Sequence, residues 1–195
     1  MRFRDERHGC LEAEPSCHEF DSKDEIPLDV TFSQMSGAIG SLLLIWSGIE
    51  KAARDEVIRF YGFLPPKAHG IKAVLRTWES TVNEAQPAET LCSLLAATLR
   101  SQLEGPLDVR NGICHGLVGI AAAVDDAPAQ LRWEMNDQKH SVSWEDLQTS
   151  LRWLSKIRFA FSMISNPALD RLDCRVVDTI ENREWWRAEW GLFLP

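Results

Sequence analysis

Apolar residues recur every three or four positions along most of this chain, which is the pattern of helices that bury one stripe. The first such stretch runs from Thr31 to about Tyr61, and Thr31 and Gln34 have the spacing of a capping box at its start. Gly62 and Pro65-Pro66 are expected to end the helix. Its predicted buried stripe consists of Met35, Ile39, Leu42, Trp46, Ile49, Ala53, Val57 and Phe60.

Three further helices follow on the same spacing. One covers about residues 68–82, and Pro87 opens the next. Gly105-Pro106 then interrupts the pattern, and because proline suits the first turn of a helix, a separate fourth helix is predicted to begin there. This fourth helix is expected to end near residues 124–128.

The spacing changes to strict alternation beyond residue 130. Residues 131–135 and 140–144 alternate between apolar and polar side chains, and Asn136-Asp137-Gln138 between them is typical of a turn, so a β-hairpin is predicted. A fifth helix should cover residues 144–164. In the tail, the tryptophans indicate a short helix docked on the body, with stacking on nucleic-acid bases as the alternative: Trp185, Trp186 and Trp190.

Together these elements predict an all-α fold, an antiparallel helical bundle with a small β-hairpin insert before the last core helix. Residues 1–30 are expected to form an N-terminal arm that is poorly ordered or extended. Residues 31–166 form the helical domain, and residues 167–195 are a tail with a short Trp-rich helix.

Glycine is unusually frequent inside two of the predicted helices. Each helical glycine costs about 1 kcal/mol relative to alanine, so a compensating contact is expected. The simplest such contact is the close approach of another helix, within the chain or across a dimer. The glycines are Gly37, Gly40 and Gly48 in the first helix and Gly112, Gly116 and Gly119 in the fourth.

Composition and charge narrow the class of protein. The chain has 195 residues and a formal net charge of −8, which argues against a broad nucleic-acid-binding surface but leaves room for a small local basic site. It begins without the apolar centre of a signal peptide and contains no uninterrupted apolar run of membrane-spanning length. We therefore expect a cytoplasmic protein that does not engage a membrane.

The cysteines predict neither disulfides nor a metal centre. They are five in number and scattered, which favours reduced thiols. His8, Cys10, Cys17 and His18 are zinc-ligand types, but their spacing matches no common structural zinc site, so a leader without metal is favoured. No cofactor is expected.

Candidate chemistry is concentrated in the segment from Arg110 to Gly116. Asn111 and His115 are four positions apart, so they share one face of a helix, whereas Arg110 lies about 140° from His115 around the axis. A site that uses both Arg110 and His115 is therefore expected to be composite, with a second copy of the chain completing it. Cys114, next to the histidine, is interpreted as a small core residue.

These residue types suit metal-free RNA cleavage. His115 is a candidate general base or acid for attack of a ribose 2′-hydroxyl on the adjacent phosphorus. Arg110 would stabilise the charge that develops on the phosphoryl oxygens, and Asn111 would orient the imidazole or the phosphate. The alternative stays open, because an arginine and a histidine on one amphipathic helix often arise without a function.

Arg110-Asn111-Gly112-Ile113-Cys114-His115-Gly116 resembles the signature of the HEPN superfamily: arginine, a polar residue, three variable positions, then histidine. The resemblance implies an antiparallel helical bundle that dimerises through the helix carrying Arg110 to His115. It also implies a metal-independent endoribonuclease with an RNA substrate, in toxin–antitoxin or antiviral defence, with an antitoxin or regulatory protein as a possible partner. Some members of the superfamily are non-catalytic interaction modules, which is the second hypothesis for this chain. An all-α scaffold unrelated to the superfamily is the third.

The same resemblance implies an acidic residue on an early helix that contacts the motif arginine. Glu50, on the flank of the apolar stripe of the first helix, is the candidate for this supporting role. Alternatively, Glu50 is solvated and pairs locally with Arg54, four positions further along the helix.

Overall fold

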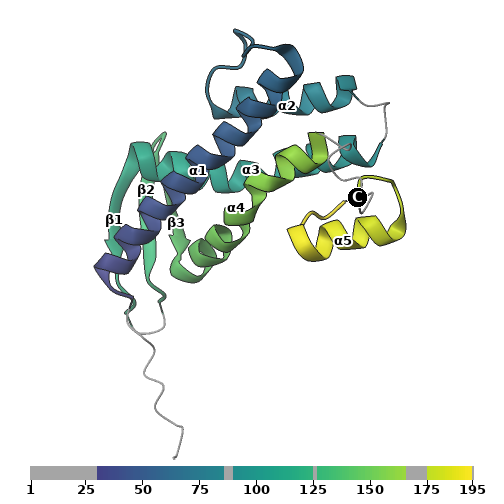
Figure 1. Ribbon diagram of the computed structural model, residues 1–195. Coiled ribbons are helices and arrows are strands. Elements are labelled where there is room, and N and C mark those ends of the chain that lie inside the picture. The colour runs from purple at the N-terminus through teal and green to yellow at the C-terminus, as the bar shows by residue number, and fades with distance from the viewer. Residues whose placement is uncertain (1–29, 86–89, 125–126, 166–174, 195) are drawn as a thin grey trace, which may run out of the picture.

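A computed structural model of the chain describes residues 30–85, 90–124, 127–165 and 175–194. Eight elements follow one another along these residues, five helices and three short strands. The helices pack as a bundle, and the strands form a sheet at one end of it (Figure 1). The predicted arm, with His8, Cys10, Cys17 and His18, lies outside the described residues except for Val30.

Helix α1 (Phe32–Tyr61) has the start and end that the sequence predicts. The Thr31 backbone N–H donates to Gln34 Oε1 at 2.8 Å, and the Gln34 N–H donates to Thr31 Oγ at 3.2 Å, which completes the capping box. Gly62 ends the helix with φ of 78°, a left-handed conformation that glycine adopts without strain. Most of the predicted stripe is buried, but Phe60 at its end is 42% exposed.

Helices α2 (Ile71–Ala85) and α3 (Leu91–Gly116) correct one prediction. The predicted third and fourth helices are a single helix, because α3 continues through Gly105-Pro106. Proline disfavours a helical predecessor largely through a clash with that residue's Cβ, which Gly105 lacks. Leu99, Leu103 and Leu107 are four apart and all buried, so core packing holds the helix in phase on both sides of the proline.

The end of the predicted fourth helix is also wrong, because α3 stops at Gly116 and a strand follows it. Strand β1 (Leu117–Ala121) pairs antiparallel with β2 (Gln130–Met135), which itself pairs antiparallel with β3 (Gln138–Ser143). The predicted hairpin is confirmed as β2 and β3, and β1 adds a third strand. Pairing with β2 satisfies the backbone groups of β1, which a solitary last turn of helix would leave open.

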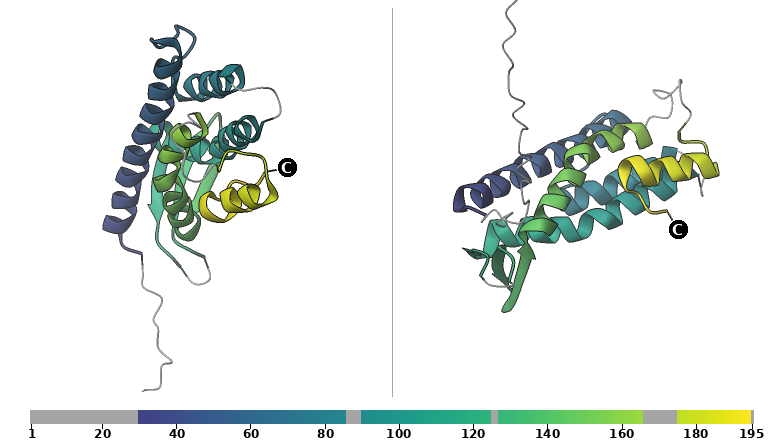
Figure 2. Two further views of the ribbon diagram at one scale, coloured as in Figure 1. Left: turned by 45° about the vertical axis from the view of Figure 1, so that its right-hand side comes forward. Right: turned by 90° about the horizontal axis from the view of Figure 1, so that it is seen from below.

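Two more helices complete the bundle. Helix α4 (Trp144–Ser165) packs along α1, and Trp78 of α2 meets Phe161 of α4 edge to face at a centroid distance of 4.5 Å. Helix α5 (Ile180–Trp190) docks on α4, as predicted (Figure 2). Trp186 is fully buried, and the Trp153 indole N–H donates to the Trp190 carbonyl at 2.8 Å, so these tail tryptophans anchor the helix.

Helix α1 is long and apolar enough, by length and composition alone, to cross a membrane; in the described part of the chain no other helix is. The relevant 18-residue window has a mean hydropathy of 1.3, and 28% of it is buried. Core helices of bundles pass the same test, and the buried stripe of α1 packs in this bundle, so the localisation of the protein stays a prediction.

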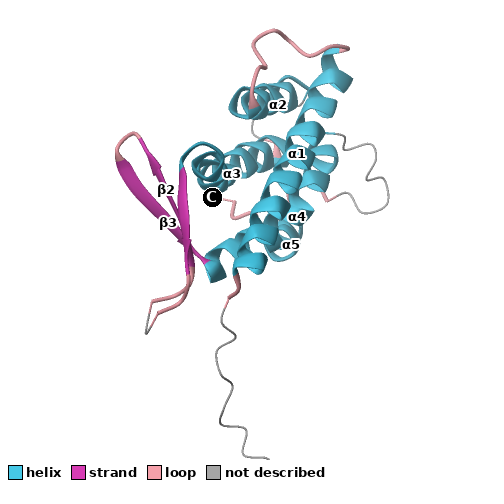
Figure 3. Ribbon diagram, turned by 90° about the vertical axis from the view of Figure 1, so that its left-hand side faces the viewer, coloured by secondary structure: helices cyan, strands magenta, loops and turns pink. Residues whose placement is uncertain are grey.

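The sheet stands beside the C-terminal end of α3, and this placement builds the surroundings of the motif (Figure 3). The hairpin turn at Asn136 and Asp137 has φ of 53° and 60°, the left-handed pair of a two-residue turn. Such a turn fixes the register, so Trp133 of β2 lies opposite His140 of β3. Leu131 and Trp133 are both buried, which places their face of the sheet against the bundle.

Candidate functional site

The motif occupies the last two turns of α3. Arg110 Nη1 donates a hydrogen bond to Asn111 Oδ1 at 3.0 Å, and both side chains are half-buried. The bond uses the amide oxygen of Asn111 and leaves its NH2 group to donate elsewhere. The structure thus joins two of the three residues that the sequence predicts for catalysis.

His115 lies on the next turn and is exposed. Among the residues that the structure describes, its side chain forms no hydrogen bond or ion pair. Within one chain, no side-chain hydrogen bond joins Arg110 to His115, in keeping with the angle of about 140° between them around the axis.

Glu50 pairs with Arg54 rather than with the motif. Its Oε1 lies 2.6 Å from Arg54 Nη2, and no ion pair links Glu50 to Arg110 within the described ranges. Of the two open alternatives for Glu50, the local pair is the one observed. Both partners are partly exposed, so the pair contributes little to stability.

The motif glycines are contacted by a strand, not by a helix. A Cβ on Gly112 would lie 2.1 Å from Nε1 of Trp133, and a Cβ on Gly116 would lie 2.1 Å from the carbonyl oxygen of Glu134. Both contacts belong to β2, so the expected helix–helix approach at these positions is wrong. Glycine is needed at both positions because no other residue leaves room for the sheet.

The remaining glycines also depart from the expectation. No atom lies within 4 Å of a Cβ built on Gly37 or Gly40, and on Gly48 the nearest is a side-chain carbon of Arg158 at 3.8 Å. Gly119 lies in β1 and has no such neighbour either. Close approach therefore explains two of the six glycines.

Cys114 is exposed, which corrects its interpretation as a core residue. The core side of this turn is occupied by Ile113, which is buried, and the sheet covers Gly112 and Gly116. The arc of α3 that runs from Arg110 past Cys114 to His115, about 140° around the axis, is thereby left uncovered by the core and the sheet.

The sheet adds an aromatic pair beside the motif. The rings of Trp133 and His140 stack at a centroid distance of 5.6 Å and an interplanar angle of 14°. Trp133 is 7% exposed and fills the space above Gly112, whereas His140 is exposed. His140 is a surface residue, as the sequence indicates, but its stacking on Trp133 was not anticipated. A two-residue turn at Asn136 and Asp137 would have revealed the pair, because counting outward from it brings residue 133 opposite 140.

A pocket of about 400 Å³ lies between α2, the end of α3 and the hairpin. Asn111 of the motif and His140 of the aromatic pair line it together. Its walls also include Lys72, Asp108, Trp133 and Gln138.

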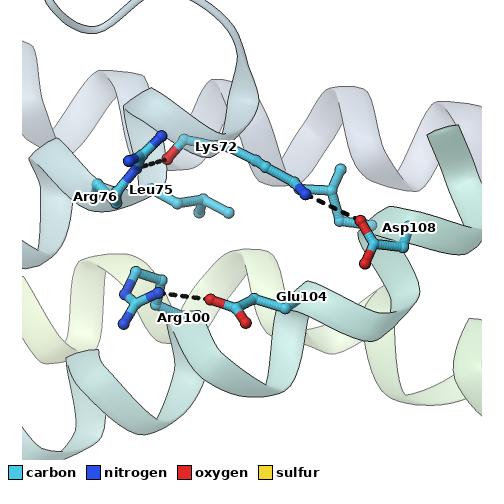
Figure 4. A pocket seen from close by; sticks show the side chains of 7 residues that line it. Lys72, Leu75, Arg76, Arg100, Glu104 and Asp108 are labelled. Carbon is cyan, nitrogen blue, oxygen red and sulfur yellow. Dashed lines mark hydrogen bonds and ion pairs between the residues drawn. The ribbon is translucent and has the colours of Figure 1, made fainter.

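A second pocket of about 340 Å³ adjoins the first, since Lys72 and Asp108 line both (Figure 4). Lys72 Nζ lies 3.0 Å from Asp108 Oδ1, and on the preceding turns of α3 Arg100 Nη1 lies 2.7 Å from Glu104 Oε1. The Nε of Arg76 donates to the Lys72 carbonyl at 3.3 Å, and Arg76 has no carboxylate partner among the described residues. A single arginine is thus available here for an anion.

Comparison with known proteins gives no match from which a function could be assigned, so the function is inferred from the geometry at the end of α3. No family model matches the chain, and no curated protein or solved structure matches it. Within the described residues, no group of three or more His, Cys, Asp and Glu side chains is placed to hold a metal ion.

Proposed function

We propose that the protein is a metal-independent endoribonuclease of the HEPN type. The observation that carries the proposal is the arrangement at the end of α3, where Arg110 holds Asn111 one turn before the exposed His115. A fixed cation, an oriented amide and a solvent-accessible imidazole can together support RNA cleavage through the 2′-hydroxyl.

In the proposed reaction, the ribose 2′-oxygen attacks the adjacent phosphorus and the bond to the 5′-oxygen of the next nucleotide breaks. His115 accepts the proton of the 2′-hydroxyl or donates one to the leaving 5′-oxygen. Arg110 and the free NH2 group of Asn111 stabilise the charge on the non-bridging oxygens. The products are a 2′,3′-cyclic phosphate and a 5′-hydroxyl, and DNA is not cleaved because it lacks the nucleophile.

A homodimer completes this site in the proposal. Arg110 and His115 lie on different sides of α3, so two copies that meet along this surface bring an arginine of one to the histidine of the other. The face with Gly112 and Gly116 is covered by β2, which leaves the arc from Arg110 past Cys114 to His115 for the contact. A role in toxin–antitoxin or antiviral systems, with an antitoxin or regulatory partner, is part of the same proposal.

The test is cleavage of a 5′-labelled RNA in the presence of a chelator by the wild type and by Arg110→Ala and His115→Ala. We expect cleavage by the wild type with cyclic-phosphate ends, and a loss of at least a hundredfold in both variants, the lower range of acid–base contributions. His69→Ala is the matched control, since it removes an exposed imidazole that lines neither pocket. Equal cleavage by all four proteins, or cleavage by none, would overturn the proposal.

One observation favours a second candidate, a non-catalytic HEPN-like interaction module. Glu50 is engaged by Arg54, so the supporting acid implied for the catalytic members does not contact Arg110. This candidate predicts a dimer that forms along α3 without RNA cleavage. Sedimentation of the purified chain together with the cleavage assay separates the two candidates.

A further inference from the structure

We propose that the pocket between α3 and the hairpin is a binding site for a base of single-stranded RNA, beside the point of cleavage. The proposal rests on the proposed function, because it assigns a substrate subsite to the same enzyme. It depends on three features of the pocket: a flat ring at its wall, unused amide groups around it, and its sharing of Asn111 with the motif.

The flat ring is His140. Its imidazole is stacked on Trp133, and Trp133 is itself held because its indole fills the space that Gly112 leaves on α3. Only one face of the imidazole is used by this stacking, and the residue is exposed. Proteins that bind single-stranded RNA stack its bases on such rings, histidine included.

The amide groups are those of Asn111, Asn136 and Gln138, which all line the pocket. An amide both donates and accepts hydrogen bonds, as the edge of a base does. Asn136 and Gln138 form no side-chain hydrogen bond with any described residue, so both are available to a base, whereas the NH2 group of Asn111 serves the phosphate in the proposed reaction. The pocket thus offers a stacking surface with several donors and acceptors around it.

The position of the pocket connects the base to the chemistry. Asn111 belongs to both the pocket and the motif, and His115 follows one helical turn later, about 6 Å along the axis. A base held against His140 therefore keeps its ribose and phosphate near the end of α3. Arg76, in the adjoining pocket, is available for a phosphate further along the RNA.

Charge also favours recognition through a base rather than through the backbone alone. The chain carries a net charge of −8, and the cations Lys72 and Arg100 in the two adjoining pockets are already paired with carboxylates. Neutralisation of RNA phosphates by these paired cations therefore contributes little to the affinity for RNA. Stacking and amide hydrogen bonds do not depend on net charge, so they suit this acidic protein.

The experiment measures binding of four 2′-O-methyl RNA hexamers, one for each base, to the full chain by fluorescence anisotropy. These probes cannot be cleaved, since the 2′-oxygen is blocked. We expect His140→Ala to weaken binding of at least one hexamer about tenfold, within the range for one lost stacking contact. His140→Phe should restore most of the affinity, and Gln138→Ala should weaken it severalfold. His69→Ala is the control and should bind as the wild type does.

Each outcome bears on one proposal. Wild-type affinity of His140→Ala and Gln138→Ala for all four hexamers, or no binding of any hexamer by the wild type, would overturn the base site. A nucleoside monophosphate that binds as tightly as its hexamer, and equally depends on His140, would assign the pocket to a free nucleotide instead. Binding that depends on His140 without cleavage of unmodified RNA supports the base site and contradicts the nuclease. Cleavage that depends on His115, with binding that does not depend on His140, supports the nuclease and contradicts the base site.

Discussion

Two pairs of glycines in this protein look alike in the sequence and differ completely in the structure. Gly112 and Gly116 of α3 are pressed against β2, with a side chain and a backbone carbonyl only 2.1 Å from where a Cβ would stand. Gly37 and Gly40 of α1 have no neighbour within 4 Å of that position. All four glycines destabilise their helix relative to alanine, but only at the two in α3 does a contact within the chain offset this free-energy cost.

The difference shows that small residues on a helix do not by themselves indicate close packing. On α3 the glycines admit Trp133, which in turn positions His140, so they are part of the pocket proposed for a base. On α1 the glycines lie on an open face with Leu44, which is 77% exposed, and no charged residue occurs in α1 before Glu50. Substitutions at the four positions test this contrast directly.

Gly116→Ala is expected to have the largest effect. The new methyl group meets the backbone of Glu134, so β2 has to move away from α3. We expect a loss of about 3 kcal/mol in the free energy of unfolding, the upper end of typical overpacking costs. Guanidinium unfolding measures it, and a loss under about 0.5 kcal/mol would show that the strand does not approach the helix this closely.

Gly112→Ala should cost somewhat less, about 2 kcal/mol, because its neighbour is the Trp133 side chain and not a backbone atom. The indole has to leave its place, and the stacking with His140 is then lost. The same unfolding measurement applies, and the double variant Gly112→Ala with Trp133→Leu should recover part of the stability. No recovery in the double variant would contradict the contact.

Gly37→Ala and Gly40→Ala are matched substitutions on the open face and should act in the opposite direction. Each is expected to raise the free energy of unfolding by about 1 kcal/mol, since alanine is the better helix former and meets no atom. A loss of stability in either variant would mean that a neighbour in solution covers this face of α1.

The reaction rates of the two described cysteines with a thiol reagent measure the exposure of the two ends of α3, and no substitution is needed. Cys92 is buried near its start, and burial raises the pKa of its thiol, so less of the reactive thiolate is present at a given pH. Cys114 is exposed at the motif. Iodoacetamide at pH 8, followed by peptide mapping, should label Cys114 much faster than Cys92 at protein concentrations that keep the chain monomeric. Equal rates at these concentrations would contradict the exposure of Cys114, whereas slower labelling of Cys114 only at higher concentration would place it in the proposed dimer contact.

Local patterns predicted the elements whose signals are contained in a few neighbouring residues. The capping box at Thr31, the hairpin turn that begins at Asn136 and the apolar spacing of α4 each depend on contacts within about four positions. The short helix α5 was predicted in the same way from its tryptophans. These predictions are confirmed by the structure.

Predictions failed where a distant segment decides the outcome. Gly105-Pro106 looks like a break, but leucines packed on both sides keep α3 continuous. Residues 117–121 fit a helix by spacing, yet they become β1 because β2 offers them a pairing edge. Exposure of Cys114 follows from the same event, since the helix ends two residues later and the sheet covers its other side.

The candidate site, too, has features that the sequence predicts and features that depend on distant segments. The sequence by itself determined that Arg110, Asn111 and His115 lie on adjoining turns, and that Arg110 and His115 point to different sides, because helix geometry fixes both. Only the tertiary structure decided that Glu50 pairs with Arg54, that β2 fills the space at Gly112, and that His140 stacks beside Asn111. The physical reason is range: a helix is set by bonds four residues apart, whereas a pocket is set by whichever segments bury their apolar faces against one another.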